Sequence, residues 1–221
     1  MRSTSKEVRY PRPIDYFLYK EFNKDRTLNS FFKPERVGKC MQLIDDYYLS
    51  VNGAITQDGW KDYYLSRVNG QNLMEACNFL KEKYKTDLET ATEYVYYRVI
   101  GQTWNGMLNE VVCIEELQNY FTNLEFRKTS FEVDQMYCTD WEAFSNDKLL
   151  FGIQIKPSSY KYMSSPYQLQ AKKYHLEQVE QYKERYGVGH FFVYHANDQM
   201  EADGIIGRIN TYLLMNIDVH L

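Results

Sequence analysis

The sequence of 221 residues lacks the features of a membrane, secreted or zinc-binding protein. It has no run of about 18 apolar residues that could cross a bilayer, and its first residues, MRSTSKEVRYPRP, contain no apolar signal segment. Its four cysteines show no C-x-x-C spacing, and its four histidines show no ligand spacing, so no zinc site is expected. We therefore expect a cytoplasmic protein with reduced, mostly buried cysteines and no membrane partner.

The sequence also lacks signals of nucleotide hydrolysis and of independent modules. No G-x-x-x-x-G-K-[ST] loop is present, so no nucleotide cofactor bound through such a loop is expected. No fixed-period repeat, low-complexity tract or Gly/Ser-rich linker divides the chain. We expect a helical block over residues 1–104 that packs on a second part over residues 105–221 and shapes a cleft there.

The composition is that of a soluble globular protein, with 44% hydrophobic residues, 16% aromatic residues and a mean hydropathy of -0.59. The formal net charge of -4 does not exclude a nucleic-acid partner. Phosphate binding depends on where Lys and Arg lie, and a site for a divalent metal is itself acidic. The charge therefore leaves the partner open.

Helical periodicity dominates the first half of the chain, and it returns after the strands. Capping and turn residues predict where these helices begin and end; Ser165-Pro166 and Gly187 bound the longest of them. The expected helices cover residues 16–24, 34–52, 59–69, 72–84, 86–101, 105–121 and 167–186, and a helical or mixed run follows over residues 204–218.

The expected helix over residues 105–121 carries an acid on its apolar stripe. Glu110 lies three residues after Met107 and four before Ile114, and this stripe continues to Phe121. A buried acid requires a partner, a hydrogen bond or a metal. Glu110 is thus either an inward-facing ligand or a stripe-edge residue that reaches solvent, and the sequence leaves both interpretations open.

Alternating residues predict strands over residues 124–130, 131–137, 149–156 and 188–196, with the last one buried on both faces. The turn-forming run FSNDK would join the second and third strands into a hairpin. That hairpin would bring Asp134 towards Gln154 and Lys156. A carboxylate, an amide oxygen and an ammonium that converge at a sheet edge are typical of metal-dependent hydrolases.

This order of elements resembles the PD-(D/E)xK nuclease superfamily. The phrases TWNGMLNE, FEVD and GIQIKP are similar to those of MjaI/BfaI-type type II restriction endonucleases, and the likeness covers most of the chain. The resemblance implies an α/β (α+β) fold, in which a mixed central sheet is flanked by helices and preceded by the helical block.

The resemblance also implies a metal site. Asp134 matches the first acid of the family, Gln154 and Lys156 match the (D/E)xK signature, and Glu110 matches the acid supplied by the preceding helix. These acids, Gln154 and the backbone carbonyl of Ile155 would hold Mg²⁺, with Lys156 orienting the attacking water. The chain departs from the family at Gln154, where an acid is usual. Among the residues nearby, Glu132 could restore the missing charge.

The activity implied is Mg²⁺-dependent hydrolysis of double-stranded DNA at a short palindrome, CTAG in the named enzymes, by a homodimer. Five basic residues flank the signature and are candidates for phosphate contacts: Arg127, Lys128, Lys161, Lys172 and Lys173. Two alternatives stay open. One is a repair or structure-directed nuclease of the same fold, and the other is a non-catalytic DNA-binding or interaction protein in which Gln154 marks lost chemistry.

Overall fold

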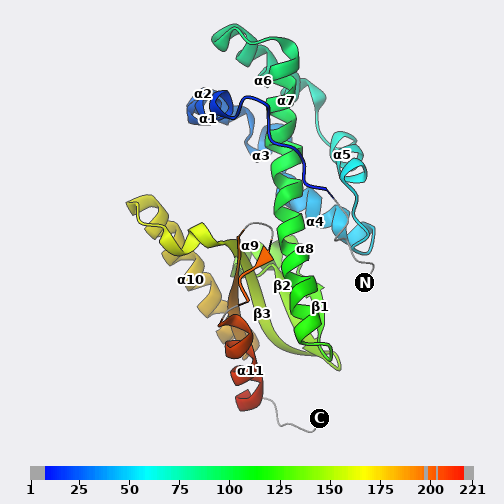
Figure 1. Ribbon diagram of the computed structural model, residues 1–221, viewed down its shortest axis with the longest axis vertical. Coiled ribbons are helices and arrows are strands. Elements are labelled where there is room, and N and C mark those ends of the chain that lie inside the picture. The colour runs from blue at the N-terminus through cyan, green and yellow to red at the C-terminus, as the bar shows by residue number, and fades with distance from the viewer. Residues whose placement is uncertain (1–7, 197–198, 203, 217–221) are drawn as a thin grey trace. The chain divides into compact units, whose positions relative to one another are not determined.

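A computed structural model describes residues 8–196, 199–202 and 204–216 (Figure 1). The chain forms two compact units, Met1–Leu108 and Asn109–Leu221, and their boundary falls within helix α8 (Gln102–Tyr120). The boundary expected between residues 104 and 105 lies in this same helix. The role expected for the helical block stays a prediction. Two parts of the sequence-based predictions lie outside the described residues: His220 and the end of the run over residues 204–218.

The first unit is helical, as the periodicity predicts. Gly38 separates α3 from α4 with a φ of 81°, so the helix expected over residues 34–52 is two helices. A further helix, α2, follows α1 in the segment where one short helix was expected. The helices are α1 (Tyr16–Lys24), α2 (Arg26–Phe31), α3 (Pro34–Val37), α4 (Cys40–Ser50), α5 (Gln57–Leu65), α6 (Gly70–Tyr84), α7 (Leu88–Tyr96) and a π-helical turn (Tyr97–Gly101) that leads into α8.

The helix end expected at Gly101 is wrong, because α7 continues through the π turn into α8. A Cβ atom at Gly101 would lie 2.6 Å from the Tyr10 ring and 2.8 Å from the Tyr97 ring. The glycine therefore permits close packing rather than chain reversal.

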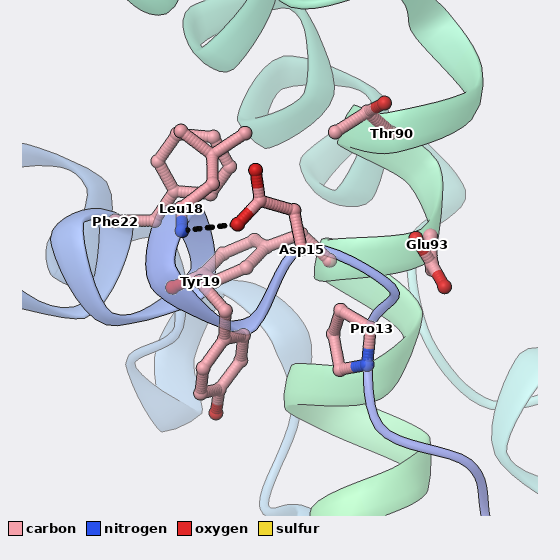
Figure 2. Close-up of a pocket in the computed structure, with 8 residues that line it drawn as sticks. Pro13, Asp15, Leu18, Tyr19, Phe22, Thr90 and Glu93 are labelled. Carbon is pink, nitrogen blue, oxygen red and sulfur yellow. Dashed lines mark hydrogen bonds between the residues drawn. The ribbon is translucent and has the colours of Figure 1, made fainter.

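Aromatic contacts hold α1 against α7. The Phe22 and Tyr94 rings pack edge to face with their centroids 4.9 Å apart, and the Tyr19 and Tyr94 ring centroids are 5.2 Å apart. Asp15 caps α1 by accepting a hydrogen bond from the Leu18 N–H at 2.9 Å, and it lines a small pocket beside α7 (Figure 2). This pocket thus belongs to the helix packing of the first unit.

The second unit is built on a five-stranded mixed sheet in the order β1-β2-β3-β4-β5. Its first three strands form an antiparallel meander, β3 and β4 are parallel, and β5 is antiparallel to β4. The helix α10 (Pro166–Tyr186) connects the parallel pair. The strands are β1 (Glu125–Lys128), β2 (Trp141–Ser145), β3 (Lys148–Pro157), β4 (Gly189–Ala196) and β5 (Gln199–Met200).

The strand expected over residues 131–137 is wrong, because this segment is helix α9 (Phe131–Tyr137). The Ser130 hydroxyl accepts a hydrogen bond from the Val133 N–H, and Cys138 ends the helix in the left-handed conformation. Seven residues that alternate by type satisfied the strand pattern, yet local capping decides the structure.

The middle strand of the meander is instead β2, which the sequence analysis assigned in part to a turn. Asn146 and Asp147 adopt φ values of 48° and 61°, and Ser145 pairs with Lys148 across them. Two consecutive left-handed residues form the tight turn that suits the twist of a β-hairpin. The turn therefore lies at the end of the predicted FSNDK loop, and the strand precedes it.

The two faces of the sheet pack against different helices (Figure 1). Trp141 of β2 contacts Glu110 of α8, whereas the next residue, Glu142, accepts a hydrogen bond from Tyr182 of α10 at 2.8 Å. Adjacent strand residues point to opposite faces, so α8 and α10 cover opposite sides. The central strand β3 is consequently buried from Leu150 through Ile155.

The later elements follow the predictions in part. The helix α10 begins at Ser165, with a capping box, and ends at Gly187 as expected. The helix α11 (Ile205–Asn216) confirms a helical end to the described chain. Burial of β4 on both faces was wrong, since Val193 alone is fully buried and its other residues are half-buried.

The composition-based expectations can be compared with the same structure. All four cysteines are free, and Cys40 is the one that is not buried. In the described residues, none of the helices combines the length and apolar character that a membrane span requires.

Replacing Gly152 in β3 should destabilise the sheet. A Cβ atom there would lie 2.7 Å from Tyr182 and 2.9 Å from His190, so Gly152→Ala should cost about 1–3 kcal/mol of unfolding free energy. Gly207→Ala in α11 is the matched control, because its added methyl group meets nothing within 4 Å and helix propensity favours alanine. Urea unfolding measures both, and equal stability of the two variants would contradict this packing.

Candidate active site

The candidate site centres on Asp140, which lies between α9 and β2 and is 5% exposed. Its Oδ2 atom accepts hydrogen bonds from the side-chain Nε2 of Gln154 and from the backbone N–H of Ile155, both at 2.7 Å. Charge-assisted hydrogen bonds of this length are strong and directional. The first residue of the predicted (D/E)xK-like signature is therefore bound directly to Asp140.

Hydrogen bonds also hold the main chain around Asp140 in position. The Asp140 N–H donates to the Ile153 carbonyl at 2.8 Å, and the Asp140 carbonyl accepts from the Thr129 N–H at 3.1 Å. The Thr129 hydroxyl donates to the carbonyls of Thr139 and Asp140 at 2.5 and 3.0 Å. These bonds extend the meander beyond β2, so the carboxylate is held against β3 by its backbone as well as its side chain.

Gln154 presents a buried acceptor without a partner. Its side chain is 2% exposed, and its Nε2 must face the Asp140 carboxylate because a carboxylate only accepts hydrogen bonds. Its Oε1 is therefore not bonded to Asp140, and among the described residues it has no hydrogen-bond partner. A buried carbonyl oxygen left unpaired is costly, and such an oxygen beside a carboxylate is a ligand type that Mg²⁺ accepts. The residues present therefore fit a hard divalent cation.

Glu110 is an inward-facing acid rather than a solvated stripe-edge residue. Its Oε2 accepts from the Lys128 ammonium at 2.9 Å and from the indole Nε1 of Trp141 at 3.3 Å. The side chains of Glu110 and Lys128 are 11% and 2% exposed. This buried ion pair answers the question that the sequence left open.

The two acids share an electrostatic environment. Burial raises the pKa of Asp140 to about 6, while Lys128 and Lys156 oppose that rise and Asp134 adds to it. Burial likewise raises the pKa of Glu110, against the effect of Lys128, and the Asp140 charge raises it further. Glu110, Lys128, Asp140 and Lys156 thus form one coupled group.

Lys156 lies at the end of β3 and is half-buried. Its charge acts on Asp140, and it also lowers the pKa of His175, for which burial is the larger cause. The His175 Nδ1 lies 3.1 Å from the Tyr160 hydroxyl oxygen. The Tyr160 ring in turn stacks on the ring of Phe192 in β4. The predicted lysine is therefore near the acid cluster.

The structure places Asp134 and Glu132 on α9 rather than on a strand. Residues two apart in a helix point in different directions, so Glu132 and Asp134 do not share a face as they would on the predicted strand. Asp134 is close enough to raise the pKa of Asp140, but Asp140 is the side chain bonded to Gln154. A metal-binding role for Asp134 or Glu132 stays a prediction.

The predicted phosphate-binding residues occupy different environments. Lys128 is buried against Glu110, with its side chain 2% exposed. Arg127 pairs with Glu125 and Asp147, each at 2.6 Å, and Lys161 pairs with Glu201. The other two lie on α10, where Lys173 is exposed near Glu177 and Lys172 lies over the Tyr160 ring. Contacts with DNA stay predictions for all five.

Within the described ranges, no three His, Cys, Asp or Glu side chains gather as a ready-made metal-binding group. Two acids, Glu110 and Asp140, and the Gln154 amide are buried side chains of the site with oxygens that a hard cation accepts. The amide oxygen of Gln154 is therefore an important part of any cation site here.

Sequence reasoning missed Asp140, although a signal for it exists. The pair Asn146-Asp147 is a turn signal, because Asn and Asp tolerate positive φ, and a two-residue turn there places the preceding strand over WEAFS. Asp140 stands directly before that strand. The longer run FEVDQMY, with its own acid, drew the assignment to the wrong segment.

Comparison with known families then identifies the class of protein. The model of the MjaI restriction endonuclease family matches residues 23–210, which include all of the site just described. The chain belongs to this family, which makes it a nuclease of the restriction endonuclease type with DNA as its substrate. Neither the curated proteins nor the solved structures gave a match.

The raised pKa of Asp140 predicts a pH-dependent stability in EDTA. The unfolded carboxyl ionises near pH 4 and the folded one near pH 6, so stability is lost as pH rises from about 4 to about 6. Asp140→Asn keeps an oxygen for both donors and carries no charge. It should exceed the wild type in unfolding free energy at pH 8 by on the order of 2 kcal/mol, with little difference at pH 4. A difference independent of pH would contradict this assignment.

Proposed function

We propose that the protein is a type II restriction endonuclease whose PD-(D/E)xK-like site uses Asp140 as its first acid, in place of Asp134. The element order α8, β1, α9, β2, β3, α10, β4 supports this assignment, since apart from the short helix α9 it is the helix, meander, helix and strand of that superfamily. The observation that carries it is the contact of Asp140 with Gln154, two residues before Lys156.

The residues suited to holding Mg²⁺ are Asp140, through its carboxylate, and Gln154, through its unpartnered Oε1. Bound there, Mg²⁺ would polarise a scissile phosphate and lower the pKa of a water ligand. The hydrogen bond from the Gln154 Nε2 keeps the carboxylate and the amide oxygen in a fixed relation. This replaces the second carboxylate of the usual signature by a neutral donor and lowers the negative charge of the site.

Lys156 is the candidate catalytic lysine. Its ammonium would neutralise a phosphate oxygen or orient the attacking water, as charge builds on the phosphoryl group. Addition of the water oxygen to phosphorus and cleavage of one P–O ester bond yield a phosphomonoester and an alcohol. The acid cluster and Lys156 all lie in the unit Asn109–Leu221.

The balance of charged residues differs between the two units, which favours different roles for them on DNA. Lys and Arg outnumber Asp and Glu in residues 1–108, whereas acids outnumber bases in residues 109–221. Phosphate contacts are therefore expected mainly from the helical unit, with the acidic unit supplying the metal site. We propose a short palindromic target, with CTAG as the first to test, and a homodimer that matches its symmetry.

Two equivalent substitutions separate Asp140 from Asp134. With Mg²⁺, Asp140→Asn should reduce DNA cleavage about 100-fold or more, because it removes the carboxylate that faces Gln154. Asp134→Asn is the matched control and should stay within about fivefold of the wild type. Initial rates on a duplex substrate measure both, and loss of activity in the Asp134 variant alone would restore the original assignment.

A plasmid digest distinguishes the proposed function from its alternatives. Discrete fragments with Mg²⁺, including cuts at CTAG sites, are expected from a site-specific enzyme. End-trimming or a smear would instead favour a repair or structure-directed nuclease. Binding without cleavage under Mg²⁺ and Mn²⁺ would support the non-catalytic alternative, in which Gln154 marks lost chemistry.

A further inference from the structure

The ion pair between Glu110 and Lys128 takes no part in the proposed hydrolysis. Its carboxylate comes from the helix that precedes the sheet, and its ammonium comes from the first strand. Two donors, the Lys128 Nζ and the Trp141 Nε1, already engage the Glu110 Oε2. Glu110 is thus held by residues of the chain itself.

The sheet dictates where the Lys128 ammonium lies. Lys128 is the cross-strand partner of Trp141, so the two side chains share the face of the sheet that α8 covers. The ammonium lies 5.9 Å from the centre of the Trp141 ring, and the Lys128 side chain is 2% exposed. Moving it to solvent would leave the buried Glu110 carboxylate uncompensated, which is strongly unfavourable.

The two buried acids and the two lysines carry balanced charges before any metal binds, and Asp134, whose charge also reaches Asp140, adds one negative charge beside them. The ionised acids Glu110 and Asp140 contribute two negative charges, and Lys128 and Lys156 contribute two positive ones, while Gln154 is neutral. One divalent ion together with one DNA phosphate adds a single positive charge, but two ions add three. In a buried site, that larger excess is costly.

We propose that the Lys128 ammonium supplies the positive charge that a second metal ion would bring to Glu110, so that the protein holds one divalent ion on Asp140 and Gln154. This inference rests on the proposed function, and it makes Glu110 a positioning residue for Lys128 rather than a metal ligand. Lys128 also acts on Asp140, so its charge limits how tightly the site holds a cation.

Mn²⁺ titration of the full chain, with free Mn²⁺ measured by electron paramagnetic resonance, tests this assignment without any reading of activity. The wild type should bind one ion per chain, and Asp140→Asn should abolish that binding. Lys128→Met keeps the aliphatic stem and frees the Glu110 carboxylate. It should bind a second ion, or bind the first about tenfold more tightly or better.

The double variant Glu110→Gln/Lys128→Met removes both charges and retains an amide oxygen for the Trp141 indole. It should bind one ion within about threefold of the wild-type affinity, because neither group is a ligand. It also decides the question if Lys128→Met alone does not fold. Lys173→Met is the control for the loss of one positive charge, because the Lys173 side chain on α10 is 79% exposed.

Two ions in the wild type, an unchanged Lys128→Met, or loss of binding in the double variant would each overturn the proposal. Failure of the proposed function is a different result. It would give no Mn²⁺ binding that depends on Asp140 in any variant, whereas failure of the Lys128 assignment leaves Asp140-dependent binding in place.

Discussion

The hydrogen bonds from Gln154 and Ile155 to the Asp140 carboxylate are the constraint on which the site depends. They join the loop before β2 to the centre of the sheet, and they fix which way the Gln154 amide is turned. The amide oxygen is thereby left buried, with no hydrogen-bond partner in the part of the chain that the structure describes. A carboxylate and an amide oxygen in this relation suit the proposed Mg²⁺ site.

Gln154, which stands where the family signature has an acid, therefore fits the buried Asp140 beside it. An acid at position 154 would place a second carboxylate against the buried Asp140, whose pKa is already raised. The amide avoids that repulsion and donates a hydrogen bond instead. Lys128 compensates Glu110, so each buried acid has a partner of a different kind.

Much of this architecture was predictable, and the failures have identifiable causes. The strand β3 and the helix α10 carry long, clear patterns with defined ends, so Gln154 and Lys156 were placed correctly. The short segments between β1 and β3 were not, because seven alternating residues are compatible with a capped helix and a five-residue strand has little periodicity. The buried contact of Lys128 with Glu110 is a tertiary property that no local pattern reports.

The central claim is that Asp140, rather than Asp134, is the acid of the metal site. Crystals of the protein grown with Mn²⁺ would test it most directly, through the position of the ion in an anomalous difference map. The predicted peak lies in contact with the Asp140 carboxylate and the Gln154 Oε1. A peak bound by Asp134 or Glu132, away from Gln154, would contradict the account.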